Sequence, residues 1–392
     1  MDYIPIAESA ENMEKDKLKK KKCRAAVLAV VSVFVVILGL LGALFLSGGF
    51  GESDYASLPR GDVSTEWTVA AEGFYNDAML ATAPDTAQVY SIMAIEHGKV
   101  VFERWYYGHQ PDSRFQVYSV SKTVLALAVG LAVEEGLFNV DDRVIDYFPE
   151  RLPENVSDTL SAMTIRHLLT MTSGKTESER LLSVFSGGDP DFDWIREFFV
   201  SPQASMPGTQ FYYNFFASYL VAAIIEKTSG TGVIEYIRPR LLEPMNITDM
   251  EWKKSPEGIC VGGWGMLLCT EDMAKLGQLL LQKGEWNGHQ LVPAAWIDTM
   301  TSSLVESRPV NAYTANMDAE MLNDPENDHS QGYGYYVWQS KYGTYRMEGM
   351  RGNLVLVNPE NETVLVFASN SNMDQRYMDL IWKHFARLVL SD

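Results

Sequence analysis

Hydrophobic residues follow three patterns along this 392-residue chain, and the first is an unbroken apolar run. Residues 25–46 are 22 consecutive positions without a charged side chain. At about 1.5 Å per residue, such a helix crosses a hydrocarbon layer of about 30 Å. The run is longer than the apolar core of a secretory signal and ends in Ser47-Gly48-Gly49. We therefore predict an uncleaved transmembrane helix at residues 25–46.

Charges beside this run predict its orientation. Residues 1–24 contain the lysine block Lys19–Lys22, followed by Arg24. Positive residues favour the cytoplasmic side of a membrane helix, so residues 1–24 are expected to be a cytoplasmic tail. Residues 47–62 are rich in glycine and have the composition of a linker. The remaining domain, residues 63–392, is expected to lie outside the cytoplasm.

The other two patterns divide residues 63–392 into strands and helices. Two β-rich runs joined at His97-Gly98 predict a hairpin, and four more strand-like runs lie within residues 332–369. Between them the chain is helical, and the run from Ser121 to Gly136 is apolar on nearly every side, which predicts a buried helix. This order predicts an α+β fold with an antiparallel sheet built from both ends of the domain and a separate helical lobe. The polar segment 304–330 is expected to be a long loop.

Composition and charge narrow the function. The net charge of −19 at pH 7 opposes attraction to phosphate backbones, so no nucleic-acid partner is expected. The three cysteines have no CxxC spacing, and the sequence contains no phosphate-binding loop and no zinc-protease motif. We therefore expect no metal and no cofactor. The six histidines are scattered and are interpreted as structural or surface residues.

The clearest chemical signal is Ser119-Val120-Ser121-Lys122 at the start of the predicted buried helix. Positions i and i+3 share a helix face, so the Ser119 hydroxyl and the Lys122 amine can meet. Serine needs a base to remove its proton, and a lysine in apolar surroundings loses its charge more readily. Taken alone, however, this short pattern is better explained by a serine that caps the helix and a lysine that reaches solvent.

A second candidate segment is PGTQFYYN, Pro207–Asn214, a turn followed by two tyrosines. Tyrosine pairs usually pack as ordinary aromatics, and spacing alone places neither of them beside Lys122. Trp264, in a glycine-rich turn, is a further candidate for the edge of a substrate pocket.

These segments together resemble the penicillin-recognising serine hydrolases, in particular the class C β-lactamase-like esterases and amidases that include the 6-aminohexanoate-dimer hydrolases. The resemblance covers roughly Val89 to Leu390 and implies a β-lactamase/transpeptidase-like fold. It rests on seven segments in the same order as in the family: YSVSKTVLALAVG, VDDRVIDYFPE, MTIRHLLTMTSG, PGTQFYYN, GGWGMLLCTEDMAKLGQLLLQKGEWNG, QGYGYYVW and YRMEGMRGN.

Carried over residue by residue, the resemblance implies that Ser119 is the nucleophile and Lys122 its base. The family's Tyr-x-Asn or Tyr-x-Ser motif begins six residues after the proline of Pro-Gly, which favours Tyr213 as the phenol that shares the proton. Tyr212 fits instead if the loop slips by one residue. With Tyr213, the third position of the motif is Phe215 rather than a polar residue.

The third family motif, Lys or His followed by Thr or Ser and Gly, aligns with Met347-Glu348-Gly349. Methionine replaces the cation, whereas the glycine still allows the strand to run close to a substrate. The resemblance implies that the Met350 N–H completes an oxyanion hole with that of Ser119. Without the cation, and with Glu348 repelling anions, we expect neutral or cationic substrates to be preferred over carboxylates.

The sequence therefore predicts a membrane-anchored, extracytoplasmic serine hydrolase that cleaves a small-molecule or peptide ester or amide through an acyl-Ser119 intermediate. One alternative is a D-alanyl-D-alanine carboxypeptidase or β-lactamase that acts on cell-wall peptides or penicillins. Another is a catalytically silent receptor with the same fold.

Overall fold

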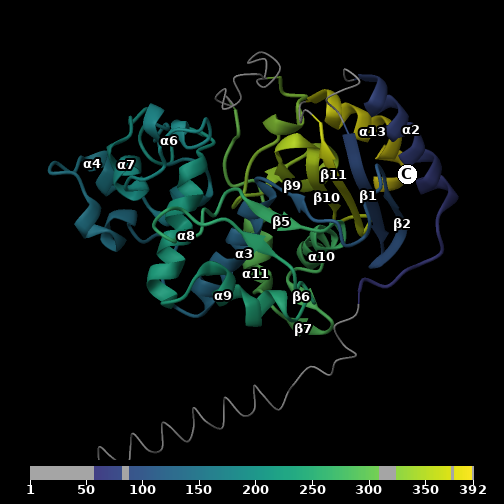
Figure 1. Ribbon diagram of the computed structural model, residues 1–392, viewed down its shortest axis with the longest axis horizontal. Helices are drawn as coiled ribbons and strands as arrows, with labels where there is room; N and C mark the ends of the chain where they lie inside the picture. The colour runs from purple at the N-terminus through teal and green to yellow at the C-terminus, as the bar shows by residue number, and fades with distance from the viewer. Residues whose placement is uncertain (1–56, 82–87, 309–323, 372–374, 391–392) are drawn as a thin grey trace, which may run out of the picture. The chain divides into compact units, whose positions relative to one another are not determined.

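The computed structural model describes residues 57–81, 88–308, 324–371 and 375–390. Within these residues, six strands form an antiparallel sheet in the order β2-β1-β11-β10-β9-β8 (Figure 1). Because β1 pairs with β11, the sheet joins the two ends of the domain, and the predicted α+β architecture is confirmed. The strand bounds are β1 (Gln88–Glu96), β2 (Lys99–Trp105), β8 (Trp338–Gln339), β9 (Tyr345–Gly349), β10 (Asn353–Asn358) and β11 (Thr363–Asn370).

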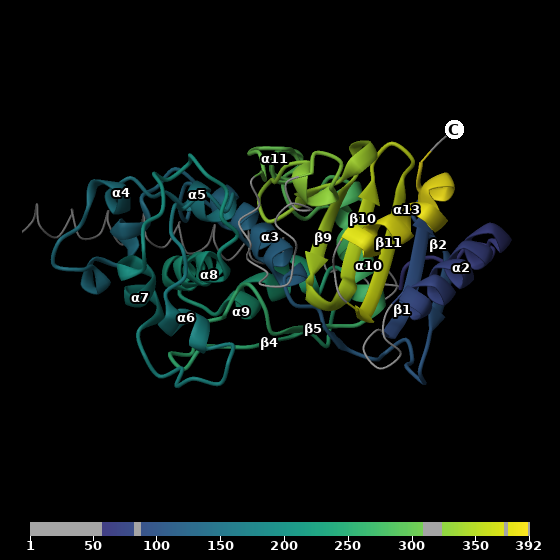
Figure 2. The ribbon, with the colours of Figure 1, turned by 90° about the horizontal axis from the view of Figure 1, so that it is seen from above.

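Helices cover both faces of this sheet (Figures 1 and 2). On one face, α2 (Thr65–Ala81) and α13 (Gln375–Val389) pack together and bury aromatic side chains such as Trp67 and Phe74. On the opposite face lies α10 (Thr270–Leu281), which contacts β10 and β11. The sheet is therefore buried on both sides, which holds β9 and its end in a fixed position.

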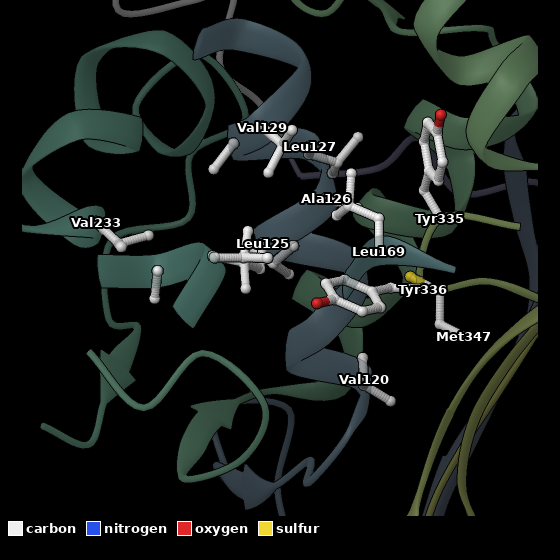
Figure 3. Close-up of a cluster of buried hydrophobic side chains, with 14 of the residues drawn as sticks. Val120, Leu125, Ala126, Leu127, Val129, Leu169, Val233, Tyr335, Tyr336 and Met347 are labelled. Carbon is white, nitrogen blue, oxygen red and sulfur yellow. The ribbon is translucent and has the colours of Figure 1, made fainter. Parts of the chain in front are cut away.

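Helix α3 (Val120–Glu134) runs between the sheet and the helical lobe (Figure 2). Every residue from 120 to 132 is buried, so the helix predicted from the all-round apolar pattern is confirmed. Figure 3 shows how its side chains are surrounded, with Val233 of the lobe on one side and Met347 of β9 on the other. A helix packed on all sides is a rigid support for the residues at its start.

The remaining elements include those of the helical lobe and of two small sheets. The helices are α4 (Asp158–Ser161), α5 (Ile165–Leu169), α6 (Glu179–Ser183), α7 (Trp194–Val200), α8 (Phe215–Ser229), α9 (Val233–Ile237) and α11 (Ala294–Met300). The strands are β3 (Phe115–Gln116), β4 (Glu251–Trp252), β5 (Met266–Leu268), β6 (Glu285–Trp286) and β7 (His289–Gln290). Single turns of 3₁₀- or π-helix are η1 (Val144–Tyr147), η2 (Pro149–Arg151), η3 (Arg238–Leu242), η4 (Asp328–Ser330), η5 (Lys341–Gly343) and η6 (Met350–Gly352).

The end of the predicted linker is attached to the folded domain. Leu58 is buried, and its N–H donates to Glu271 Oε1 over 2.8 Å. The backbones of Pro59 and Gly61 pair with Val100 of β2. Among the described residues, none of the helices is both long and apolar enough for a membrane crossing. The tail predicted at residues 1–24 and the membrane helix predicted at 25–46 lie outside the described residues.

Candidate active site

Ser119 immediately precedes α3, and its hydroxyl makes no hydrogen bond that caps the helix. The preceding residue, Tyr118, has a φ of 49°, a conformation that costs energy for a residue with a side chain. Such backbone strain is common where a fold must hold a reactive group in place. The serine is therefore positioned for something other than helix capping.

Lys122 lies one turn into α3 and is 1% exposed. Its Nζ donates to Ser119 Oγ over 3.0 Å and to the Gly263 carbonyl over 2.9 Å. Desolvation lowers the pKa of Lys122 to about 7, although the negative charge of Glu177 acts in the opposite direction. The alternative explanation, in which the serine caps the helix and the lysine reaches solvent, therefore does not fit this pair. At neutral pH the amine is available as a base for Ser119.

The loop that faces this pair requires glycine. A Cβ at position 263 would stand 2.9 Å from Lys122 Nζ and would overlap Ser218 Oγ. Gly262 has a φ of 69°, which favours glycine as well. The Gly262-Gly263 pair thus lets the backbone carbonyl approach Lys122 closely and accept its hydrogen bond.

The structure brings Tyr213, not Tyr212, to this pair. The Tyr213 hydroxyl is hydrogen-bonded to Ser119, and its ring centroid lies 4.9 Å from Lys122 Nζ. Burial holds the pKa of Tyr213 well above its usual range, so the phenol remains protonated. Its ring stacks on Trp338 at a centroid distance of 5.8 Å. Tyr212 instead points its hydroxyl toward Glu177.

Glu177 is a site residue that no sequence motif indicated. Its Oε1 accepts the Phe215 N–H over 2.8 Å, and its carboxylate is hydrogen-bonded to the Tyr212 side chain. These two contacts lie on either side of Tyr213 in the chain, so Glu177 fixes the segment that carries this phenol. Burial raises the pKa of Glu177, while these hydrogen bonds oppose that increase.

The end of β9 lies directly against the start of α3. A Cβ on Gly349 would overlap the Val117 carbonyl and stand 3.2 Å from the Ser119 nitrogen. Only glycine allows this approach, as the alignment with the third motif implies. Met350 follows at once, so the backbone N–H groups of Ser119 and Met350 belong to adjacent segments, as an oxyanion hole requires.

Glu348 is held in an ion-pair network rather than facing the site as a free charge. Its carboxylate lies 2.8 Å from His329 Nε2 and 2.7 Å from Arg346 Nε. Burial alone would raise the pKa of Glu348, but His329 and Arg346 outweigh it and lower the pKa to about 2. The carboxylate is therefore ionised and already neutralised, which weakens the expected repulsion of anionic substrates. Sequence analysis did not connect His329 with this motif.

A pocket of about 340 Å³ opens beside Ser119. Phe215, which occupies the motif position where the family has a polar residue, lines this pocket. Trp264 and Met350 line it as well. Phe185, which sequence analysis did not single out, contributes a further wall. The complete lining is Gln116, Tyr118, Ser119, Phe185, Phe215, Trp264 and Met350.

Comparison with known proteins decides the family. The Beta-lactamase family model matches residues 77–385 of the chain. The chain belongs to the Beta-lactamase family. The fold brings together Ser119, Lys122 and Tyr213, the residues that the resemblance selected as nucleophile, base and phenol. The chain is a serine hydrolase of this family.

Comparisons with individual proteins show how far the similarity extends. An uncharacterized protein of Alkalihalophilus pseudofirmus is 26% identical over 315 residues, which are 72% of this chain and 83% of that protein. The 6-aminohexanoate-dimer hydrolase of Paenarthrobacter ureafaciens is 20% identical over 312 residues, 75% of this chain and 77% of that one. The structure of a D-stereospecific amidohydrolase from Streptomyces superposes with a TM-score of 0.61 and 19% identity, over 81% of this chain and 98% of that chain. This last likeness concerns the fold.

Proposed function

We propose that this protein is a membrane-anchored, extracytoplasmic serine hydrolase that cleaves neutral esters or amides through an acyl-Ser119 intermediate. The observation that carries the proposal is the contact of 3.0 Å between the buried Lys122 amine and Ser119 Oγ. With a pKa of about 7, this amine can take the hydroxyl proton at neutral pH without assistance from a histidine.

The geometry supports the following steps. Lys122 Nζ takes the proton of Ser119 Oγ as the oxygen attacks the substrate carbonyl carbon, and the oxyanion forms beside the N–H groups of Ser119 and Met350. The C–O or C–N bond to the leaving group then breaks, and the leaving atom receives a proton from the Tyr213 hydroxyl. The Lys122 ammonium group in turn gives its extra proton to the Tyr213 oxygen, so both side chains return to their starting states. Water hydrolyses the acyl ester by the same steps in reverse, which restores free Ser119.

The location of the enzyme rests on the sequence. The apolar run at residues 25–46 and the Lys19–Lys22 block support a helix that is anchored with its N-terminus in the cytoplasm. The active site would then act on substrates outside the cytoplasm.

Labelling with a fluorophosphonate probe tests the proposed function. The probe reacts only with an activated serine, so the full-length chain is expected to be labelled and Ser119→Ala is not. Tryptic mapping of the adduct must find it on Ser119. A folded but unlabelled protein would support the silent receptor instead.

A chromogenic β-lactam distinguishes the alternative enzyme. Relatives that bind a substrate carboxylate use a cation where this chain has Met347, and a hydrogen bond to a charged group contributes about 1.5–3 kcal/mol. We therefore expect kcat/KM for a carboxylate-bearing substrate to be about 10- to 100-fold lower than for a neutral analogue. A β-lactam turned over as well as the best neutral ester would favour the cell-wall enzyme. The substrates screened should include amide oligomers, in view of the name of the Paenarthrobacter relative.

A further inference from the structure

The pocket beside Ser119 has an aromatic wall that the proposed chemistry does not use. Phe185 follows α6, and its ring centroid lies 5.1 Å from that of Phe215 and 4.9 Å from that of Trp264. These three rings come from separate segments and line the pocket together with Ser119 and Met350. The volume of about 340 Å³ falls within the range of about 300–1,000 Å³ typical of small-molecule sites.

The pocket mouth is apolar as well. Phe185 is 46% exposed and Met350 is 45% exposed, so both side chains offer apolar surface that a bound group can cover. Among the seven described residues that line the pocket, none is charged. A bound group would therefore find apolar contacts from the mouth to Ser119, and an ionised group would lose its hydration without an opposite charge.

The position of the proton donors indicates which part of a substrate enters the pocket. A leaving group must receive its proton from Tyr213 or Lys122, and neither of them lines the pocket. The leaving group is therefore expected on the Tyr213 side of Ser119. The substituent on the other side of the scissile carbonyl, the acyl chain, then faces Phe185 and Trp264.

We propose that this pocket binds the acyl chain of the substrate and selects long, apolar acyl groups, and that Phe185 is the side chain that determines this specificity. The proposal rests on the proposed acyl-Ser119 chemistry and adds the substrate class to it.

The test is a series of p-nitrophenyl esters from acetate to octanoate, in which the leaving group stays constant. Complete burial of a methylene group corresponds to about a fourfold gain in affinity, so kcat/KM should rise from acetate to octanoate by at least tenfold. Equal kcat/KM values along the series would overturn the assignment. A chain-length preference found only in a second series, in which the alcohol part varies and the acyl part stays constant, would overturn it as well.

Phe185→Ala should lower the octanoate-to-acetate ratio of kcat/KM about tenfold, because the octanoyl chain loses its contact with this ring. Leu182→Ala is the matched control. Leu182 belongs to α6 and is equally exposed at 45%, but it does not line the pocket, so its ratio should equal that of the wild type. The same ratio in both variants would show that Phe185 has no special role.

A binding measurement on Ser119→Ala separates this proposal from the catalytic one. Octanamide should bind to this variant at least tenfold more tightly than acetamide, as followed by NMR titration, and Phe185→Ala in the same background should remove the difference. Binding of this kind in a protein that the fluorophosphonate probe does not label would retain the pocket and reject the catalytic proposal. Labelling of Ser119 without any chain-length effect would retain the catalytic proposal and reject the role of the pocket.

Discussion

At the scale of single residues, the property on which catalysis depends is the charge of Lys122. Desolvation favours the neutral amine, whereas the negative charge of Glu177 favours the ammonium form, and the outcome is a pKa of about 7. The Lys122 amine acts as a base only when it is neutral, so acylation should become faster as the pH rises through this value. Tyr213 stays protonated throughout because its pKa lies above its usual range.

Glu177→Gln should move this pH dependence. The variant keeps an oxygen that can accept the Phe215 N–H but removes the negative charge, so the pKa of Lys122 should fall and the acidic limb of kcat/KM should shift to lower pH. The measurement is the pH profile of ester hydrolysis from pH 5 to 9. Glu179→Gln, two residues away and exposed, is the control and should leave the profile unchanged. An unmoved limb in Glu177→Gln would show that its charge does not reach Lys122.

The two tyrosines should respond differently to loss of their hydroxyl groups. Tyr213→Phe removes the phenol beside Ser119 and should lower kcat at least 100-fold, in the range typical of general acid catalysis. Tyr212→Phe removes only a contact with Glu177 and should cost less than tenfold. Steady-state kinetics on a p-nitrophenyl ester measure both variants. The reverse order would mean that Tyr212 supplies the phenol.

The residues that sequence analysis could name are those that belong to a local pattern. Ser119 and Lys122 are one helical turn apart, and Tyr213 is at a fixed distance from Pro207. Phe185 and Glu177 belong to no such pattern, because their importance comes from contacts made across the fold with Phe215. Spacing along the chain contains no signal for such contacts.

At the scale of elements, β9 combines a functional end with an interior ion-pair network. Gly349 abuts the start of α3, while Glu348 and Arg346 are neighbours along the same strand and pair with each other. The buried Arg346 guanidinium also donates to Ser340 Oγ, and His329 reaches Glu348 from η4. The sequence showed the strand and its glycine, but the charge partner His329 comes from a polar segment that was expected to be a loop.

Glu348→Gln should destabilise the protein strongly. The substitution leaves Arg346 buried without its carboxylate, and breaking a buried pair in this way typically costs about 3–5 kcal/mol. Urea unfolding at pH 7 measures the loss. Because the folded pKa of Glu348 is lowered to about 2, its stabilisation is present above the ordinary pKa of a glutamate and is lost as the pH falls toward 2. The difference between variant and wild type should therefore shrink below about pH 4.5.

A matched control for this measurement is Glu362→Gln. Glu362 pairs with His97 at a distance of 2.9 Å, but both side chains are mostly exposed. Exposed pairs contribute about 0–1 kcal/mol, so this variant should unfold almost like the wild type. Equal losses in the two variants would show that the network around Glu348 does not act as a buried ion pair.

The helices illustrate why some elements are easier to predict than others. The apolar run of α3 is continuous, and it was predicted within two residues at its C-terminal end. Helix α2 was not predicted, although Trp67, Ala71, Phe74 and Ala78 are buried at helical spacing. Two of these four positions are alanines, whose small side chains give a weak apolar signal, and only the contacts with α13 show that this face is buried.

At the scale of the whole molecule, the site assembles where the sheet meets the helical lobe. The Gly263 carbonyl accepts a hydrogen bond from Lys122, yet Gly263 lies more than 140 residues after Ser119 in the chain. The order of strands and helices along the chain predicted the two parts of the fold, but it did not predict which loops would meet between them. The family resemblance supplied part of that information, for Tyr213 and for the end of β9, but not for Gly263, because contacts over such separations depend on how the whole chain folds.

The last prediction concerns the position of the whole molecule relative to a membrane. Residues 25–46 lack charged side chains, and the cationic block Lys19–Lys22 precedes them, so the intact chain should remain with the membrane fraction after a high-salt wash. In intact cells, protease added from outside should digest the domain at residues 63–392, while an epitope tag at the N-terminus stays protected until the membrane is opened. Replacing Lys19–Lys22 and Arg24 with glutamine should reduce the fraction of chains in this orientation, because the positive residues favour the cytoplasmic side. Recovery of the intact chain in the soluble cytoplasmic fraction would refute both the anchor and the external location of the active site.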